Sequence, residues 1–285
     1  MPMKKINRKE ISIMSIETKF TGTDTYVASD DLMAAVEVAM ELQKPLLIKG
    51  EPGTGKTMLA EAVAKSLNKE LLIWNIKSTT KAQDGLYMYD TIQRLYDSQF
   101  GVEGVDDIAR YIKLGKLGET FKKEEQVILL IDEIDKADLE FPNDLLWELD
   151  KMEFYINETK ETVKAKIRPI VIITSNAEKE LPDAFLRRCI FHYISFPGKD
   201  LMRQIVNAHF ENLQEHLLEQ AMKTFYWIRD IRDIRKKPST SELIDWLRAL
   251  MIGGIDPDTI QKQLPYLGVL VKKDEDLEIV KQMNV

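Results

Sequence analysis

Short apolar runs recur along the first two-thirds of the chain, and each has the length of a buried β-strand. Between them, apolar residues fall at the three- and four-residue spacing of helices with one buried face. Strands that alternate with helices in this way form a parallel sheet covered on both faces. The pattern therefore predicts an α/β fold with five parallel strands, near residues 45–49, 71–76, 127–132, 170–175 and 190–195.

The pattern changes after the Pro-Gly-Lys sequence at 197–199. Residues 200–250 keep a helical period almost throughout and contain no strand candidate. We therefore divide the chain into an α/β core at 1–198 and a small all-helical unit at 199–285. The last stretch of the helical unit is predicted to be either a short packed helix or a tail.

Composition narrows the class of protein. The 285 residues are 44% hydrophobic and 31% charged, as in ordinary globular domains. A net charge of −7 argues against a protein that coats nucleic acid. The longest apolar runs, such as 127–131, are too short to span a bilayer, and we expect no leader in residues 1–16. The single cysteine, Cys189, cannot form an internal disulfide, which favours a reducing, cytoplasmic location.

One glycine-rich segment has the pattern of a phosphate-binding loop. The sequence GEPGTGKT lies between a strand candidate and a helical pattern, as such a loop requires. Glycines let backbone N–H groups approach phosphate oxygens, Lys56 supplies positive charge, and the Thr57 hydroxyl is a ligand for Mg²⁺. The residues predicted to bind nucleotide here are Gly50, Glu51, Pro52, Gly53, Thr54, Gly55, Lys56, Thr57 and Met58.

A second motif, VILLIDEID at 127–135, ends a buried strand with two acidic residues. The carboxyl ends of parallel strands are where ligands bind to such sheets. Asp132 is therefore predicted to hold Mg²⁺ together with Thr57, and Glu133 to polarise the attacking water. The alternative is a surface acidic pair at a strand end. Water activation favours an ATPase over a small kinase, and the N-K-x-D motif of GTPases is absent.

Two further candidate sites follow along the chain. Asn176 ends the strand IVIITSN, where its amide would orient the attacking water; the alternative is a helix cap. Arg187 and Arg188 end a short helix before the fifth strand. A guanidinium pair at this position fits an arginine finger that acts on the ATP of a neighbouring subunit. The alternative is an ordinary ion pair or a helix C-terminal charge.

The order of these motifs resembles that of AAA+ ATPases, and their details resemble the MoxR family. The similarity covers residues 20–255 and rests on GEPGTGKT, VILLIDEID, IITSN and LPDAFLRRC. It implies an AAA+ P-loop core with strand order 5-1-4-3-2 and a helical lid that closes over the nucleotide. It also implies that residues 26–28 lie near the adenine, and that Arg188 fits the finger register better than Arg187.

Two segments add to the resemblance. MoxR-like proteins carry an insert in the second core helix, which here would occupy residues 78–120; a longer core helix with a loop is the alternative. Alternating runs on either side of a polar turn predict a β-hairpin at 153–168, where MoxR-like proteins place one. The resemblance implies that both segments face the centre of a ring and contact a substrate or partner.

One position departs from the family pattern. Many AAA+ proteins place an arginine at the start of the third lid helix, and here Ser241 stands at that position. The basic residues at 235–237 are not in register with it. The charged run at 229–237 favours a solvated helix face over a binding patch. Four tryptophans lie among apolar neighbours and are predicted to be core residues: Trp74, Trp147, Trp227 and Trp246.

The sequence thus predicts a Mg²⁺-dependent ATPase that, by resemblance, forms a homo-oligomeric ring, expected to be a hexamer. The resemblance also implies a chaperone-like machine that remodels, matures or activates a partner complex, together with a protein that carries a von Willebrand A-type domain. Two other classes stay open. One is a nucleic-acid-associated motor or loader, which stimulation by DNA would reveal. The other is a nucleotide-gated scaffold with little turnover, against which Glu133 argues.

Overall fold

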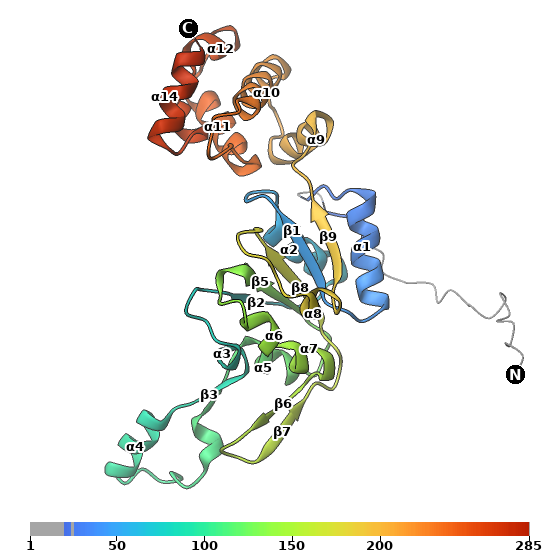
Figure 1. Cartoon of the computed structure of the whole chain (residues 1–285), viewed down its shortest axis with the longest axis vertical. Helices are drawn as coiled ribbons and strands as arrows, with labels where there is room; N and C mark the ends of the chain where they lie inside the picture. The colour runs from blue at the N-terminus through green and yellow to red at the C-terminus, as the bar shows by residue number, and fades with distance from the viewer. Residues whose placement is uncertain (1–19, 24–25, 285) are drawn as a thin grey trace, which may run out of the picture.

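The computed structural model describes residues 20–23 and 26–284, in an α/β part and a helical part that stand one above the other (Figure 1). The segment 1–16, for which no leader is expected, lies outside the described residues. No helix in the described part of the chain combines the length and the apolar character needed to cross a membrane.

The α/β part is built on a sheet of five parallel strands. The strands follow the order β2-β5-β8-β1-β9. Read from the opposite edge, this is the predicted order 5-1-4-3-2, so the predicted fold is confirmed. The five strands are β1 (Leu46–Gly50), β2 (Leu71–Asn75), β5 (Ile128–Asp132), β8 (Ile170–Ser175) and β9 (Ile190–Ile194).

Alternate side chains of the central strands pack into two separate apolar layers, one on each face of the sheet. Leu46 and Ile48 pack toward one face, whereas Leu47 packs toward the other, because side chains alternate along a strand. All three are fully buried, and each such side chain contributes about 1.5–3 kcal/mol by leaving water. This explains why the strands read as continuous apolar runs.

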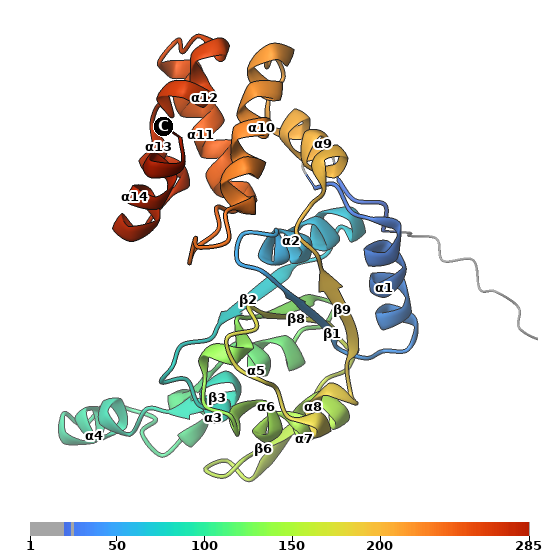
Figure 2. The same cartoon turned by 45° about the horizontal axis from the view of Figure 1, so that its top comes forward.

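Helices cover both faces of the sheet (Figures 1 and 2). On one face lie α1 (Asp30–Glu41), capped by the Ser29 hydroxyl, and α2 (Lys56–Leu67). The layer on the other face contains the helices α3 (Ala82–Leu86), α5 (Lys116–Phe121), α6 (Phe141–Asp144), α7 (Leu146–Lys151) and α8 (Asp183–Leu186).

Two small antiparallel ladders extend from this second layer. The first pairs β3 (Tyr87–Tyr89) with β4 (Ile112–Leu114). Between these strands an arm, residues 90–111, holds α4 (Thr91–Gln99) and a 3₁₀ turn, η1 (Ile108–Tyr111), and projects away from the sheet (Figure 2). The second pairs β6 (Glu153–Ile156) with β7 (Glu161–Lys164). The region predicted as an insert is therefore a set of short elements and not one long helix.

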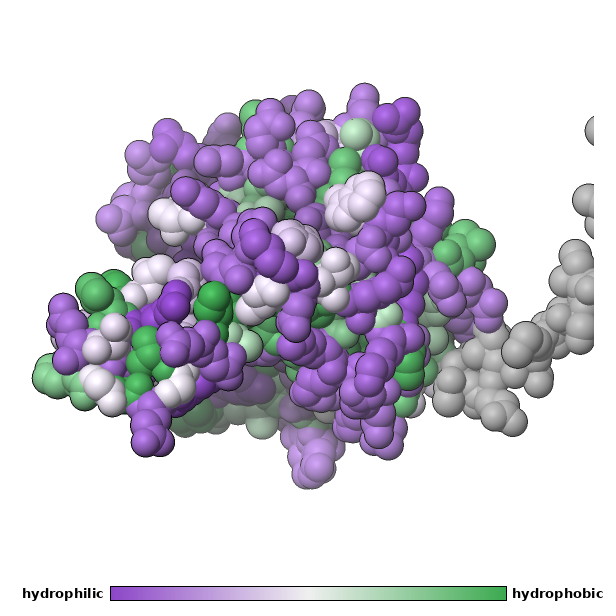
Figure 3. Space-filling view, turned by 90° about the horizontal axis from the view of Figure 1, so that it is seen from below, coloured by the Kyte–Doolittle hydropathy of each residue, from purple (hydrophilic) through white to green (hydrophobic). Residues whose placement is uncertain are grey.

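The arm carries apolar side chains in water. Ile92, Leu95, Tyr96 and Phe100 are all exposed, and the rings of Tyr96 and Phe100 stack on each other. The view from below shows apolar surface gathered on this lobe (Figure 3). A helix that leaves its apolar residues uncovered is typical of an interaction surface.

The helical part has an apolar core of its own. Large side chains such as Phe225 and Trp246 are buried in it, and α14 contributes Val280, so the end of the chain is a packed helix. The elements are α9 (Lys199–His209), α10 (Glu215–Asp230), α11 (Thr240–Ile252), η3 (Pro257–Thr259), α12 (Ile260–Gln263), α13 (Leu267–Leu270) and α14 (Asp274–Met283).

The prediction for the tryptophans is wrong for one of them. Trp74 and Trp246 are buried, but the Trp147 side chain is 60% exposed and lies under the Lys151 ammonium. Trp147 sits in α7, a helix of six residues, and its apolar neighbours in sequence point to the other side of that helix.

Candidate nucleotide site

The loop between β1 and α2 has the backbone that a phosphate cradle needs. Gly53 and Gly55 have φ angles of 74° and 83°, in the left-handed region that glycine adopts without strain. At Gly50 a Cβ atom would meet the Ile194 carbonyl oxygen at 2.6 Å. The glycines of the motif are thus required by the fold, and they leave the backbone N–H groups of the loop accessible.

Lys56 points its ammonium group back into the loop. Its Nζ donates to the carbonyl oxygens of Gly50 and Glu51, at 2.9 and 2.8 Å. Burial lowers the pKa of Lys56, and the carboxylates of Asp135, Glu133 and Asp132 act in the opposite direction. A buried positive charge therefore stands where a nucleotide would place its phosphates.

Asp132 and Thr57 meet at the carboxyl edge of the sheet. The Thr57 hydroxyl donates to both carboxylate oxygens of Asp132, at 3.1 and 3.3 Å. From the neighbouring strand, Thr174 donates its hydroxyl to Asp132 Oδ1 at 2.6 Å and accepts the Glu133 N–H at 2.8 Å. Sequence reasoning missed Thr174. The available signal is its position two residues before Asn176, on the same face of the strand.

Glu133 is held in a strained position beside Asp132. Its φ and ψ angles of 59° and 52° are left-handed, which is uncommon for a residue other than glycine. The Asn176 amide donates to Glu133 Oε1 at 2.7 Å, and the Lys136 ammonium pairs with Oε2. Lys136 belongs to the 3₁₀ turn η2 (Ile134–Lys136). The amide predicted to orient water thus contacts the carboxylate predicted to polarise it.

Asp135 fixes the loop that carries Asn176. It is 2% exposed and accepts the backbone N–H groups of Asn176 and Glu178, at 3.2 and 2.9 Å. These bonds satisfy a carboxylate that would otherwise be costly to bury. The sequence shows Asp135 only as the last residue of the acidic motif and does not indicate this role.

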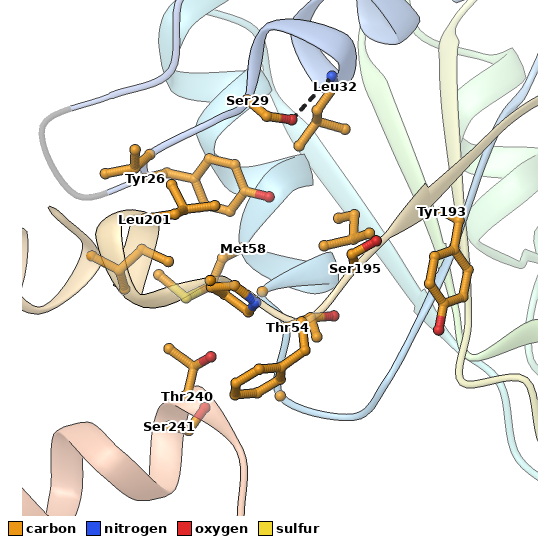
Figure 4. Close-up of a pocket in the computed structure, with 18 of the residues that line it drawn as sticks. Tyr26, Ser29, Leu32, Thr54, Met58, Tyr193, Ser195, Leu201, Thr240 and Ser241 are labelled. Atoms are coloured by element: carbon orange, nitrogen blue, oxygen red, sulfur yellow. Dashed lines mark hydrogen bonds between the residues drawn. The ribbon is translucent and has the colours of Figure 1, made fainter. Parts of the chain in front are cut away.

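Two cavities meet at the phosphate loop. The smaller, about 250 Å³, is lined by Lys56, Thr57, Asp132, Glu133 and Asn176 among others. The larger, about 320 Å³, is mainly apolar and lies between the core and the helical part. Figure 4 shows Tyr26 and Met58 on its core side and Thr240 and Ser241 facing it from α11. An apolar cavity joined to a polar one fits a base and its phosphates.

The donor set also fits a magnesium ion. Thr57 and Asp132 offer a hydroxyl and a carboxylate, which are the oxygen ligands that Mg²⁺ prefers. Among the described residues, no group of three His, Cys, Asp or Glu side chains is arranged to hold a metal. At nucleotide sites Mg²⁺ is usually held by one or two protein oxygens together with phosphate oxygens and water, and Thr57 and Asp132 would supply the protein oxygens here.

Ser241 lines both cavities, whereas the basic residues near it face elsewhere. Arg235 pairs with Glu275, and Lys236 pairs with Glu242. They line a separate hollow on the outer side of the phosphate loop. Over the residues that the structure covers, the lining of the phosphate cavity contains no arginine.

Arg187 and Arg188 lie at the amino ends of the strands, which we call the amino edge, opposite the carboxyl edge that carries the phosphate loop. They come just before β9, whose first residue pairs with Leu46 at the start of β1, whereas the phosphate loop follows the end of β1. Arg188 donates to Asp150 Oδ2 at 2.7 Å and to the Ala184 carbonyl. Arg187 is exposed and makes no ion pair with any described residue. A five-residue strand of about 17 Å separates these arginines from the loop of their own chain.

The prediction of a helix face at 229–237 is wrong, although the charged residues from Asp230 onward are exposed as predicted. Helix α10 ends at Asp230, and most of the run is a loop. Ile231 and Ile234 pack into the core of the helical part, and the Arg229 side chain is buried against the phosphate loop. The charged residues on either side of Ile231 and Ile234 made the whole run look polar, so the two buried isoleucines were not recognised as core residues.

A family profile described as "AAA domain (dynein-related subfamily)" matches residues 45–189. The chain is 32% identical over 176 residues to the chaperone protein ClpB of Chlamydia trachomatis serovar D, a match that covers 59% of this chain and 19% of ClpB. It is 25% identical over 241 residues to an uncharacterized protein of Staphylococcus haemolyticus, with 83% of this chain and 84% of that protein covered. A further match, to midasin of Dictyostelium discoideum, is 32% identical over 53 residues, which are 19% of this chain and 1% of midasin.

Proposed function

The chain belongs to the AAA domain family, in its dynein-related subfamily, and from this premise we propose that it hydrolyses ATP to ADP and phosphate with Mg²⁺. The observation that carries the proposal is the convergence of Lys56, Thr57, Asp132, Glu133 and Asn176 on one cavity beside the phosphate loop. A nucleotide-binding module with no hydrolytic role would not need a carboxylate at Glu133, beside Asp132 and in contact with the Asn176 amide.

Each of these side chains has a distinct task. Lys56 and the loop N–H groups hold the phosphates, and Thr57 and Asp132 would hold the metal, which lowers the negative charge on the transferred phosphoryl group. Glu133 accepts a proton from the attacking water as the bond between the γ-phosphorus and ADP breaks. Asn176 keeps the Glu133 carboxylate in place through its 2.7 Å hydrogen bond.

We further propose that hydrolysis requires a second copy of the chain. Arg187 and Arg188 lie at the end of the sheet remote from their own phosphate loop, which supports a role on a neighbour's ATP. Arg188 would exchange its surface pair with Asp150 for that contact. This supports a homo-oligomeric ring, and a hexamer is the ring size we expect from the resemblance to MoxR proteins. Arg188 is the finger that the motif register favours.

The work done by the ring is proposed to be chaperone-like remodelling of a partner complex in the cytoplasm. The similarity to a protein named as a chaperone supports this class, and so does the arm at 90–111 with its exposed apolar side chains. The chain spans about a fifth of the length of ClpB, so the similarity reaches the ATPase module and not the whole chaperone. By resemblance to MoxR proteins, a partner with a von Willebrand A-type domain is expected.

The first test is ATP turnover per chain as a function of protein concentration, with Mg²⁺ and no partner. Turnover is expected to climb steeply and then level off, because the active site is completed between subunits. Substantial turnover that stays flat where sizing shows only monomer would refute the arginine finger and the ring. Added DNA is expected to leave the rate unchanged, and strong stimulation would favour a nucleic-acid motor.

A further inference from the structure

Arg229 is a buried cation at the junction of the core and the helical lid, the part formed by residues 199–285. It lies in the last turn of α10 and is 7% exposed. Arginine is seldom buried without a partner, because removing its charge from water is costly. The contacts that compensate the buried charge of Arg229 therefore indicate its structural role.

Three groups surround the Arg229 guanidinium. Its carbon lies over the Phe196 ring, 3.2 Å from the ring centre, in a cation–π contact. One nitrogen, Nη1, donates to the Pro238 carbonyl oxygen, and the other, Nη2, donates to Glu51 Oε2 at 2.9 Å. Glu51 is the second residue of the phosphate-binding motif and is the carboxylate that pairs with this arginine.

Each of these partners adjoins a different part of the nucleotide site. Phe196 lines the larger cavity, in the segment that joins the core to the lid. Pro238 precedes Ser239, the N-cap of α11, and a Cβ added at Gly53 would lie 2.4 Å from the Ser239 Cβ. Glu51 offers its backbone carbonyl to Lys56. Through Arg229, the base cavity, the lid and the phosphate loop are in contact with one another.

The ion pair joins parts of the chain that can separate. Arg229 lies in the last turn of α10 in the lid, whereas Glu51 belongs to the phosphate loop of the core and has a side chain that is 45% exposed. If the lid moves away, Glu51 regains water but Arg229 loses its carboxylate partner. Arg229 is the buried member of this half-exposed pair, and leaving a buried cation without its carboxylate is costly, so the pair favours one seating of the lid.

From this geometry we propose that Arg229 is a positioning residue of the nucleotide site, and that through Glu51 it couples the seating of the lid to the conformation of the phosphate loop. Coupling of this kind is reciprocal, so a nucleotide that orders the loop also favours the seated lid. The inference rests on the proposed ATPase function only for its kinetic readout. Lid and loop coupling is measurable without turnover.

The test compares four variants of the full chain: Arg229→Gln, Arg229→Lys, Glu51→Ala and the double variant Arg229→Gln with Glu51→Ala. Arg248→Gln is the matched control, because Arg248 also belongs to the lid, faces the Phe210 ring and pairs with Asp245, but lies away from the phosphate loop. The readouts are amide hydrogen exchange without nucleotide, ADP affinity by calorimetry, and KM and kcat for ATP.

The expected result is reciprocal. Arg229→Gln speeds exchange at residues 51–58, and Glu51→Ala speeds exchange at residues 229–240, although each change is in the other part of the chain. Each single variant weakens ADP binding and raises KM about tenfold, and the double variant is no worse than either. Arg229→Lys recovers part of the affinity, since it keeps the charge but not the two-armed contact.

Three outcomes would overturn the proposal. One is a Glu51→Ala variant with unchanged exchange in the lid and unchanged ADP affinity, which would make Arg229 a lid-packing residue only. Another is a double variant whose effects add, and the third is an equal effect of Arg248→Gln. If the wild-type chain shows no turnover and no nucleotide binding, the proposed function fails, while the exchange experiment still decides the coupling.

Discussion

The two edges of the parallel sheet differ in how their charged side chains are held. At the carboxyl edge, Asp132 and Glu133 each contact two neighbouring side chains, and the polar groups there satisfy one another. At the amino edge, Arg187 is exposed without an ion pair among the described residues, and Arg188 has a single surface pair with Asp150. One edge is organised before any ligand arrives, whereas the other keeps a guanidinium free for an outside partner.

The largest effect is expected at the less organised edge. Arg188→Ala should lower kcat about a thousandfold, as loss of an arginine finger does, and should leave ATP affinity of the same chain intact. Steady-state turnover and nucleotide binding measure the two quantities. Arg187→Ala, measured alongside, is expected to lose less.

A mixing experiment sharpens the comparison. Chains with Arg188→Ala keep Glu133, and chains with Glu133→Gln keep Arg188, so a mixed ring contains sites with both groups intact. Turnover of the mixture should exceed that of either variant alone. If mixing restores nothing although the two variants co-assemble, the arginine does not act on a neighbour.

The next largest effect on kcat is expected at the carboxyl edge, where the polar side chains hold one another. Glu133→Gln should lower kcat about a hundredfold or more, because the amide cannot accept the proton of the attacking water. ATP binding should persist, since the amide oxygen can still accept the bond from Asn176. The exposed neighbour Glu178, changed to Gln, is the control and should stay within twofold. A Glu133→Gln chain with near-normal kcat would remove Glu133 from the mechanism.

A smaller effect is expected where the phosphate loop meets the lid. Gly53→Ala places a Cβ 2.4 Å from the Ser239 Cβ and forces an alanine to a φ angle of 74°. The left-handed conformation alone costs about 1–2 kcal/mol, so KM for ATP should rise about tenfold or more. Gly101→Ala has a similar φ angle of 65° with open space around it, and should leave KM unchanged. Equal KM values for the two variants would argue against contact between loop and lid.

The smallest expected effect is a difference in unfolding free energy between variants of two buried threonines, Thr174 and Thr224. Thr174→Val removes the hydroxyl that bonds both Asp132 and the Glu133 backbone, which should cost about 1–2 kcal/mol of unfolding free energy. In the lid, the buried Thr224 hydroxyl has no hydrogen-bond partner among the described residues, so Thr224→Val should be neutral or stabilising. Chemical denaturation of both variants measures the difference. A Thr224→Val chain that loses as much as Thr174→Val would contradict this assignment.

The strands and the fold class were predictable because their signals are local, whereas the strand order came from the resemblance to AAA+ ATPases. Each central strand is buried on both faces, so it reads as an uninterrupted apolar run, and the motifs at the strand ends place the loops between them. The phosphate loop is equally local, since its glycines are needed by a backbone turn of a few residues. The roles given to Glu133, Asn176 and the arginines remain predictions that kinetics must test.

The residues that escaped prediction act across long stretches of sequence. Arg229 contacts Glu51 over a separation of 178 residues, and the charged run around it suggested solvent. Thr174 lies inside an apolar strand and resembles a strand-forming residue until the neighbouring strand supplies Asp132. Such pairs depend on tertiary packing, which hydrophobic period and motif spacing do not encode.

The exposed indole of Trp147 gives the amino edge a built-in spectroscopic reporter. Trp147 lies three residues from Asp150, the partner of Arg188, whereas Trp74 and Trp246 are shielded in the two cores. Iodide in solution can therefore quench the fluorescence of Trp147 but cannot reach those two buried indoles. The partly buried Trp227, in the lid, gives a background that a Trp227→Phe variant removes. If a second copy of the chain covers this end of the sheet, as proposed, the quenchable fraction of the emission should fall, so the proposed assembly can be tested in the unmodified chain without an attached dye.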